Sequence, residues 1–281
     1  PTLFIIFISI ISNTMKNTKP IGIFDSGIGG ISVMSHIQSL LPNESLAYVA
    51  DSLFAPYGLK SKDVILERSK TAIDYLIKKQ SVKLIVVACN TATAAAIQEL
   101  RQIYQIPIIG MEPAIKPATK ATICKKVGIL ATNGTLDSAK FSALLETYSG
   151  EIDFYTQPCP GLVELIEQGR IDDSSIKNLI QKYLNPLIER KVDTIVLGCT
   201  HYVFIRNIIE NIMGPEVKII DTGLAVAKHV RSELEKFSLQ NKSKGKYYSI
   251  STNSINKEME EIIRSITINS DFKFSYFDSW S

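Results

Sequence analysis

The chain has 281 residues, 45% of them hydrophobic, which is enough for one large domain or two smaller ones with buried cores and argues against disorder. Its 31 Lys and Arg residues against 28 Asp and Glu leave a net charge of only +3, without a basic run that would hold a phosphate backbone. We therefore expect no nucleic-acid partner. Four cysteines, none in a C-x-x-C pair, are too few for a disulfide scaffold and predict free thiols in a reducing cytoplasm.

An apolar run from Leu3 to Ile11 begins the chain, but it is too short to span a bilayer. No basic residue precedes it and no cleavage site follows it, so it makes a poor signal peptide, and we expect no membrane association. Met15 is the better start of the protein. Residues 1–19 are accordingly expected to be a non-native or disordered extension.

From Pro20 onward, short apolar runs rich in Ile, Val and Leu alternate with longer stretches of helical period, which predicts a mostly parallel sheet covered by helices. The expected strands, in chain order, are residues 21–25, 46–50, 84–88, 107–110, 127–131, 152–155, 194–198, 218–221 and 247–251. The expected helices are residues 31–41, 62–79, 91–104, 162–168, 175–189, 202–213, 223–237 and 254–266. Pro186 is expected to kink or split the helix over 175–189.

Three signatures of the first half recur in the second half in the same order, roughly 110 residues later. Residues 21–27 resemble 127–133, residues 84–91 resemble 194–201, and residues 107–110 resemble 218–221. The repeat predicts two similar α/β halves, each with a cysteine directly after a buried strand. Because ligands of open α/β sheets collect beyond the carboxyl ends of the strands, we expect both cysteines at one crevice.

Cys89 and Cys199 each lie at a predicted strand-to-helix turn, where exposed backbone N–H groups lower a thiol pKa and bind carboxylates. A free cysteine is often only a small buried hydrophobe. Two matched thiols, however, suit a reaction that is symmetric about a carbon atom, in which one group removes a proton from one face and the other returns a proton to the opposite face. Asp25 could assist Cys89, and His201 could assist Cys199.

Three other chemistries fit these residues less well. The glycine-rich turn over 27–30 lacks the full G-x-G-x-x-G spacing, so we expect no dinucleotide cofactor. Zinc held by Cys89, Cys199 and His201 would lack the usual ligand spacing, and we expect no metal. A cysteine hydrolase with His201 as its base is the stronger competitor, but it leaves the second cysteine unexplained.

Five motifs, read in order over about residues 20–266, resemble the glutamate racemase family: residues 24–30 (FDSGIGG), 55–58 (APYG), 88–92 (ACNTA), 159–167 (CPGLVELIE) and 197–202 (LGCTHY). The resemblance implies cofactor-independent interconversion of L- and D-glutamate, which supplies D-glutamate for peptidoglycan. It also implies that Cys89 deprotonates the D isomer with help from Asp25. Cys199 would deprotonate the L isomer, with His201 and then Glu167 behind it. The substrate contacts that it implies are Asp25, Ser26, Pro56, Tyr57, Gly58, Asn90, Thr91, Thr93, Thr200 and His201.

Two alternatives stay open beside this family. An aspartate racemase is built on the same two-cysteine plan. Aspartate racemases, however, usually carry a glutamate residue after the second Cys-Thr pair, where this chain has His201, and this favours glutamate as the substrate. A binding module without turnover is disfavoured because both thiols and both assisting groups are present.

The fold that we expect is α/β: two similar domains with mostly parallel sheets that face each other across a central cleft, related by a pseudo-twofold axis. Residues 20–113 and 223–270 would form the first domain, residues 114–222 the second, and residues 271–281 a C-terminal tail. The resemblance further implies a homodimer.

Overall fold

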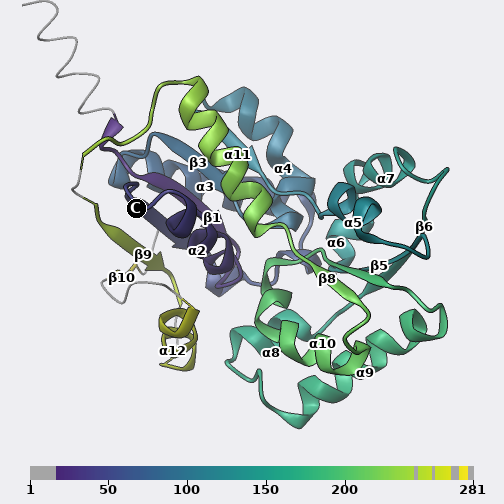
Figure 1. Ribbon diagram of the computed structural model, residues 1–281. Helices are drawn as coiled ribbons and strands as arrows, with labels where there is room; N and C mark the ends of the chain where they lie inside the picture. The colour runs from purple at the N-terminus through teal and green to yellow at the C-terminus, as the bar shows by residue number, and fades with distance from the viewer. Residues whose placement is uncertain (1–16, 244–245, 255–256, 267–271, 278–281) are drawn as a thin grey trace, which may run out of the picture.

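The computed structural model describes residues 17–243, 246–254, 257–266 and 272–277 (Figure 1). The predicted extension over 1–19 therefore lies almost wholly outside the described residues. The strands are β1 Ile21–Asp25, β2 Leu46–Ala50, β3 Leu84–Val87, β4 Ile108–Gly110, β5 Lys126–Ala131, β6 Asp153–Pro158, β7 Thr194–Leu197, β8 Lys218–Ile220, β9 Tyr248–Thr252 and β10 Phe272–Tyr276.

Helices connect these strands and cover both sheets (Figure 1). The α-helices are α2 Ile31–Leu40, α3 Lys62–Gln80, α4 Asn90–Ile103, α5 Ile115–Ala121, α6 Asn133–Leu136, α7 Ala139–Glu146, α8 Leu162–Glu167, α9 Ser174–Glu189, α10 Arg206–Met213, α11 Gly223–Lys236 and α12 Lys257–Ile266. The described residues also form the 3₁₀ helices η1 Ser52–Phe54, η2 Tyr57–Leu59 and η3 Thr200–Ile205. None of the helices in the described part of the chain has the length and apolar character needed to cross a bilayer.

The strands form two sheets, and all strand pairs are parallel. The first sheet has the order β10-β9-β2-β1-β3-β4, and the second has the order β6-β5-β7-β8. Each sheet with its helices is called a lobe below. The order β2-β1-β3-β4 matches β6-β5-β7-β8 strand for strand, so the sequence repeat corresponds to a repeated topology. The predicted α/β class with two mostly parallel sheets is confirmed, whereas the exact domain limits stay a prediction.

The central strands are apolar on both faces because helices cover both sides of each sheet. All residues of β1, β3 and β7 are buried. Strands of this kind read in sequence as short continuous runs of Ile, Leu and Val, and for that reason their positions were predicted to within one or two residues.

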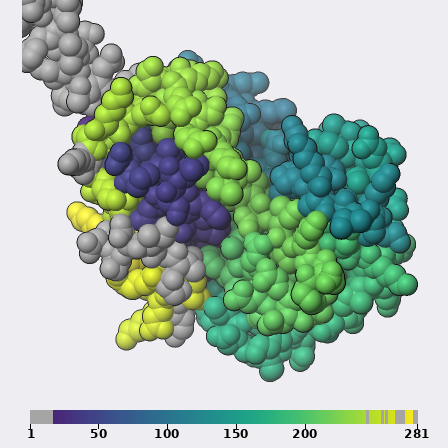
Figure 2. Space-filling model, viewed as in Figure 1, coloured from purple at the N-terminus to yellow at the C-terminus, as the bar shows by residue number. Residues whose placement is uncertain are grey.

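After β8 the chain returns to the first lobe. Helix α11 packs against α2, and the two cover the same part of the first lobe (Figure 2). Strand β9 then pairs with β2, and β10 pairs with β9. The expected tail at 271–281 is therefore wrong in its described part, since residues 272–276 form an edge strand. Phe272 packs on the core there, with its ring 6.0 Å from that of Tyr248.

Three further differences from the predicted elements have physical causes. Helix α9 is continuous through Pro186, which lies in its last turn, because Ile180, Leu184 and Leu187 bury one face of the helix on the core. The predicted helix over 202–213 is α-helical only from Arg206, after the 3₁₀ turn η3. Helices α5, α6 and α7 were not predicted, because their apolar patterns are short.

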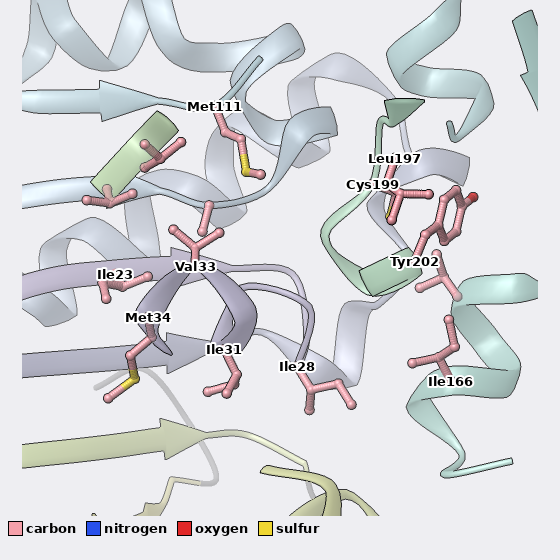
Figure 3. Packing of buried hydrophobic residues seen from close by; sticks show 14 of the residues in the cluster. Ile23, Ile28, Ile31, Val33, Met34, Met111, Ile166, Leu197, Cys199 and Tyr202 are labelled. Atoms are coloured by element: carbon pink, nitrogen blue, oxygen red, sulfur yellow. The ribbon is translucent and has the colours of Figure 1, made fainter. Parts of the chain in front are cut away.

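One apolar cluster continues from the first lobe into the second and fixes how they face each other. It includes Ile28 and Ile31, at the start of α2, and Ile166 and Tyr202 of the second lobe (Figure 3). All four side chains are at most 1% exposed. Cys199 belongs to the same cluster, so the apolar contact between the lobes reaches the edge of the predicted site.

Candidate active site

The carboxyl ends of strands from both lobes face one narrow cavity of about 10 Å³. Both Cys89 and Cys199 line it, and they are only 5% and 7% exposed. The lining residues are Ser26, Pro56, Tyr57, Gly58, Cys89, Asn90, Thr91, Thr132, Val163, Cys199, Thr200 and His201. The cavity thus brings together all the predicted substrate contacts except Asp25, which lies directly behind Ser26, and Thr93.

Thr93 serves the packing of the first lobe. Its hydroxyl donates to the carbonyl of Val87 at 3.2 Å and accepts from the backbone N–H of Met111 at 2.9 Å. The residue is fully buried and joins the end of β3 to the segment after β4. The structure therefore places Thr93 behind the wall of the cavity.

Cys89 is the N-cap of α4, and its sulfur accepts a hydrogen bond from the backbone N–H of Ala92 at 3.4 Å. The Ser26 hydroxyl lies 3.7 Å from the same sulfur. Burial raises the pKa of the Cys89 thiol, and the charge of Asp25 raises it further. In this arrangement Cys89 is held as the protonated thiol.

Asp25 ends β1 and is fully buried behind Ser26. One of its oxygens accepts from the Ser26 backbone N–H at 2.7 Å, and the other accepts from the Thr200 hydroxyl of the second lobe at 3.1 Å. Ser26 thus lies between the carboxylate and Cys89. Burial raises the pKa of Asp25 to about 6, although the nearby His201 opposes the shift.

Cys199 has a different partner. Its sulfur lies 3.8 Å from Nδ1 of His201, and Nε2 of the same ring lies 2.5 Å from Oε1 of Glu167. Glu167 also accepts the backbone N–H of Ile28 across the lobes at 2.8 Å. Burial lowers the pKa of His201, but the contacts with Cys199 and Glu167 outweigh it and hold this pKa well above its ordinary value. His201 is therefore held as the cation, next to the second thiol.

The Asn90 side chain presents unpaired polar atoms at the cavity. Its side-chain oxygen and nitrogen are both buried, and neither has a hydrogen-bond partner within the described structure. A buried amide without partners costs free energy, so such groups are rare unless a bound molecule satisfies them. Asn90 lines the cavity, which places one donor and one acceptor where a zwitterionic ligand would lie.

The glycine-rich turn after β1 has a close-packing role. A Cβ at Gly27 would lie 1.9 Å from Oε1 of Glu167, and one at Gly29 would lie 2.4 Å from Oγ1 of Thr200. The glycines therefore let the first lobe approach Glu167 and Thr200 of the second lobe closely. Among the described residues, no three His, Cys, Asp or Glu side chains are placed to share a metal ion.

Two residues that line the cavity, Thr132 and Val163, were not among the predicted contacts. Thr132 follows β5 and lies 2.9 Å, hydroxyl to hydroxyl, from Thr91 of the other lobe. The repeat contained the signal for it, because Thr132 occupies the position that Ser26 has in the first half. No sequence signal indicated Val163, since it is one apolar residue in an amphipathic helix.

Known proteins match this chain over most of its length. The model of the Asp/Glu/Hydantoin racemase family matches residues 21–230. A glutamate racemase of Ectopseudomonas mendocina is 50% identical over 225 residues, which cover 80% of this chain and 85% of that protein.

Solved structures of glutamate racemases share the fold. One isoform from Bacillus anthracis superposes with a TM-score of 0.82 at 29% identity, covering 92% of this chain and 97% of that one. The enzyme of Francisella tularensis in complex with D-glutamate gives a TM-score of 0.80 at 29% identity, with 94% and 99% covered. The resemblance seen in the sequence is confirmed, and the chain belongs to the Asp/Glu/Hydantoin racemase family of isomerases.

Proposed function

We propose that the protein interconverts L- and D-glutamate without a cofactor, with Cys89 and Cys199 as acid/base groups on opposite faces of the substrate Cα. The observation that carries this proposal is that both thiols line one closed cavity, each with its own assisting group. The relatives named above are glutamate racemases, and one of their structures holds D-glutamate.

The charges of the site favour one starting state. Cys89 is protonated, and the His201 cation stabilises a thiolate on Cys199. With L-glutamate, the Cys199 thiolate removes the Cα proton, and the electron pair of the broken C–H bond is delocalised toward the α-carboxylate. The Cys89 thiol then donates its proton to the opposite face, which gives D-glutamate. The thiolate and thiol have exchanged places, and proton exchange with solvent restores them.

No Arg or Lys side chain would hold the substrate. None of the lining residues is Arg or Lys, so its carboxylates would bind backbone N–H groups, hydroxyls and the Asn90 amide. The N-terminus of α4 adds a favourable dipole. Fixed dipoles in a closed site of this kind also stabilise a developing carbanion, because they need no reorganisation when the charge appears.

The wider setting belongs to the same proposal. We infer a cytoplasmic homodimer that supplies D-glutamate for peptidoglycan, and this inference rests on the family resemblance. Its dimeric state is checked by sedimentation of the purified protein.

The activity is tested by incubating the purified protein with L-glutamate in D₂O, without added cofactor, and following optical rotation together with deuterium at Cα. We expect the rotation to decay to zero while deuterium accumulates in the product. Racemisation of L-aspartate in place of L-glutamate would assign the protein to the sister activity. No exchange with either amino acid would leave the hydrolase and the binding module as the remaining candidates.

A further inference from the structure

The loop between β2 and α3 forms one wall of the cavity through Tyr57 and Gly58. It consists of the short 3₁₀ helices η1 and η2, and its backbone is held by local bonds such as Phe54 N–H to Asp51 C=O at 2.9 Å and Lys60 N–H to Tyr57 C=O at 3.0 Å. Local turns of this kind shape a loop, but they do not fix where it lies on the rest of the protein. Other contacts must hold Tyr57 at the cavity.

Asp51, the residue after β2, supplies the anchor of this loop. Its carboxylate is fully buried and accepts the Tyr57 hydroxyl at 2.7 Å. Arg68 of α3 binds it through two nitrogens, Nε at 2.8 Å and Nη2 at 2.5 Å, which compensates the buried charge. The Arg68 guanidinium also lies 3.7 Å from the ring centre of Phe54, so the same side chain holds the loop at a second point.

Asn253 completes the anchor from the other end of the chain. It follows β9, and its Nδ2 donates to Oδ1 of Asp51 at 2.5 Å. Its Oδ1 accepts the backbone N–H of Leu53 at 2.9 Å. The side-chain amide of Asn253 therefore uses its nitrogen to bind the carboxylate that holds Tyr57 and its oxygen to bind the backbone of the loop.

We propose that Asn253 is a positioning residue for the reaction, which acts through Asp51 on Tyr57 and so makes the C-terminal segment part of the active-site architecture. The inference rests on the proposed function, because the effect it describes is on substrate binding. Asn253 touches neither the cavity nor the thiols, so its loss lets the loop shift while Cys89 and Cys199 stay in place. Misplacement of a substrate-positioning group by about 1 Å, even through a change far from the reacting atoms, can cost an enzyme up to about 10²-fold.

The test compares Asn253→Ala with Ser275→Ala. The control removes a hydrogen bond of the same C-terminal sheet edge, between the hydroxyls of Ser251 and Ser275 at 2.7 Å, and does not touch the loop. We expect Asn253→Ala to raise KM for glutamate about tenfold with a smaller change in kcat, and Ser275→Ala to leave both within about twofold. Equal kinetic changes in the two variants, with equal losses of Tm, would show a merely structural role and overturn the proposal.

A double-mutant cycle identifies the route of the effect. Asn253→Ala and Tyr57→Phe both act on the Asp51 anchor, so their combined effect on KM should fall short of the product of the single effects. Strictly multiplicative effects would contradict a route through Asp51.

One readout is independent of catalysis. Hydrogen exchange of the peptide containing Leu53 should be faster in Asn253→Ala than in the wild type and unchanged in Ser275→Ala, because the Leu53 amide loses its acceptor. A wild type that fails to racemise glutamate would refute the proposed function while this exchange difference still measured the anchor. Unchanged exchange at Leu53 would refute the anchor whatever the activity.

Discussion

Cys89 and Cys199 occupy the same position in the two lobes, each two residues after the strand in third place along the shared strand order. Their surroundings differ. Cys89 caps the 14-residue helix α4 and contacts Ser26, which has Asp25 behind it, whereas Cys199 precedes the six-residue 3₁₀ helix η3 and faces His201. One thiol therefore has an acidic neighbourhood and the other a cationic one.

The turn that follows each strand explains the difference. An α-helix directs its first N–H groups at the cap, so the Cys89 sulfur meets the Ala92 N–H. The tighter 3₁₀ turn keeps a side chain two residues on close to the cap, and His201 consequently lies beside Cys199. A repeated topology sets where the two thiols lie, and the local helix type sets which neighbouring groups each thiol contacts.

The largest effect is expected from removing either thiol. Cys89→Ser and Cys199→Ser should each lower racemisation by about 10³-fold or more, because a hydroxyl is far less acidic than a thiol and each turnover needs both groups. Optical rotation of L-glutamate measures this loss. Full activity in either single variant would overturn the two-base assignment.

Variants of the two assisting groups, His201 and Asp25, should affect proton transfer on opposite faces of the substrate Cα. We expect His201→Asn and Asp25→Asn each to lower kcat/KM by about 10²-fold, the scale of one general acid–base contribution. Since enantiomers have equal free energies, kcat/KM stays equal in the two directions, and the asymmetry appears in isotope effects. His201→Asn should enlarge the effect of Cα deuterium on L-glutamate, and Asp25→Asn the effect on D-glutamate. Identical isotope effects in the two variants would contradict the assignment of one helper to each thiol.

Asp25, the buried carboxylate on the Cys89 side, should also make the free energy of unfolding depend on pH. Burial holds the pKa of Asp25 at about 6 against an ordinary 3.8, so between these pH values the folded protein keeps a proton that the unfolded chain releases. Stability should therefore fall as pH rises from about 4 to 6, by about 3 kcal/mol for a shift of this size, and stay at the lower level above pH 6. Asp25→Asn should have a higher Tm than the wild type at pH 8, with a gain that shrinks toward pH 4.

Calorimetry of Asp193→Asn supplies the control for this pH trend. Burial raises the pKa of Asp193, but hydrogen bonds from Thr122 and the backbone of Cys124 and Ile123 outweigh it and hold the pKa at about 2. Its contribution to stability is present above pH 3.8 and is lost only as pH falls toward 2, so the cost of Asp193→Asn should be constant from pH 5 to 8. A pH-independent Tm difference between Asp25→Asn and the wild type would show that burial does not raise the pKa of Asp25.

The contrast between what was and was not predictable has a physical reason. Buried parallel strands are recognisable in sequence as apolar runs. The turns that follow two of these strands contain the cysteines and their neighbours within a few residues, so Cys89, Cys199 and His201 could be found from the sequence. The Asp51 anchor could not, because Asn253 reaches it from 202 residues away and nothing in an Asn near the C-terminus indicates such a contact. Residues 272–276 carry the alternation of aromatic and polar residues that indicates a half-buried strand, but the alternation spans only five residues at the end of the chain and was taken for a tail.

The smallest effect on activity is expected from changing Glu167, which binds His201 on the side away from Cys199. Glu167→Gln keeps an oxygen that can accept the Ile28 N–H, but it removes the negative charge that raises the pKa of His201. The imidazolium should then lose its proton at lower pH, and the thiolate on Cys199 loses its stabilising cation with it. We expect kcat to fall about tenfold at pH 8, less at pH 6, with the alkaline limb of the pH profile displaced to lower pH.

Glu164→Gln, on the same helix α8 but outside the lining of the cavity, is the matched control and should leave that limb in place. A uniform loss in Glu167→Gln across the pH range would mean that the carboxylate only holds the two lobes together through Ile28. The displaced limb, in contrast, would show that the Cys199 side works through the charge that Glu167 supplies to His201.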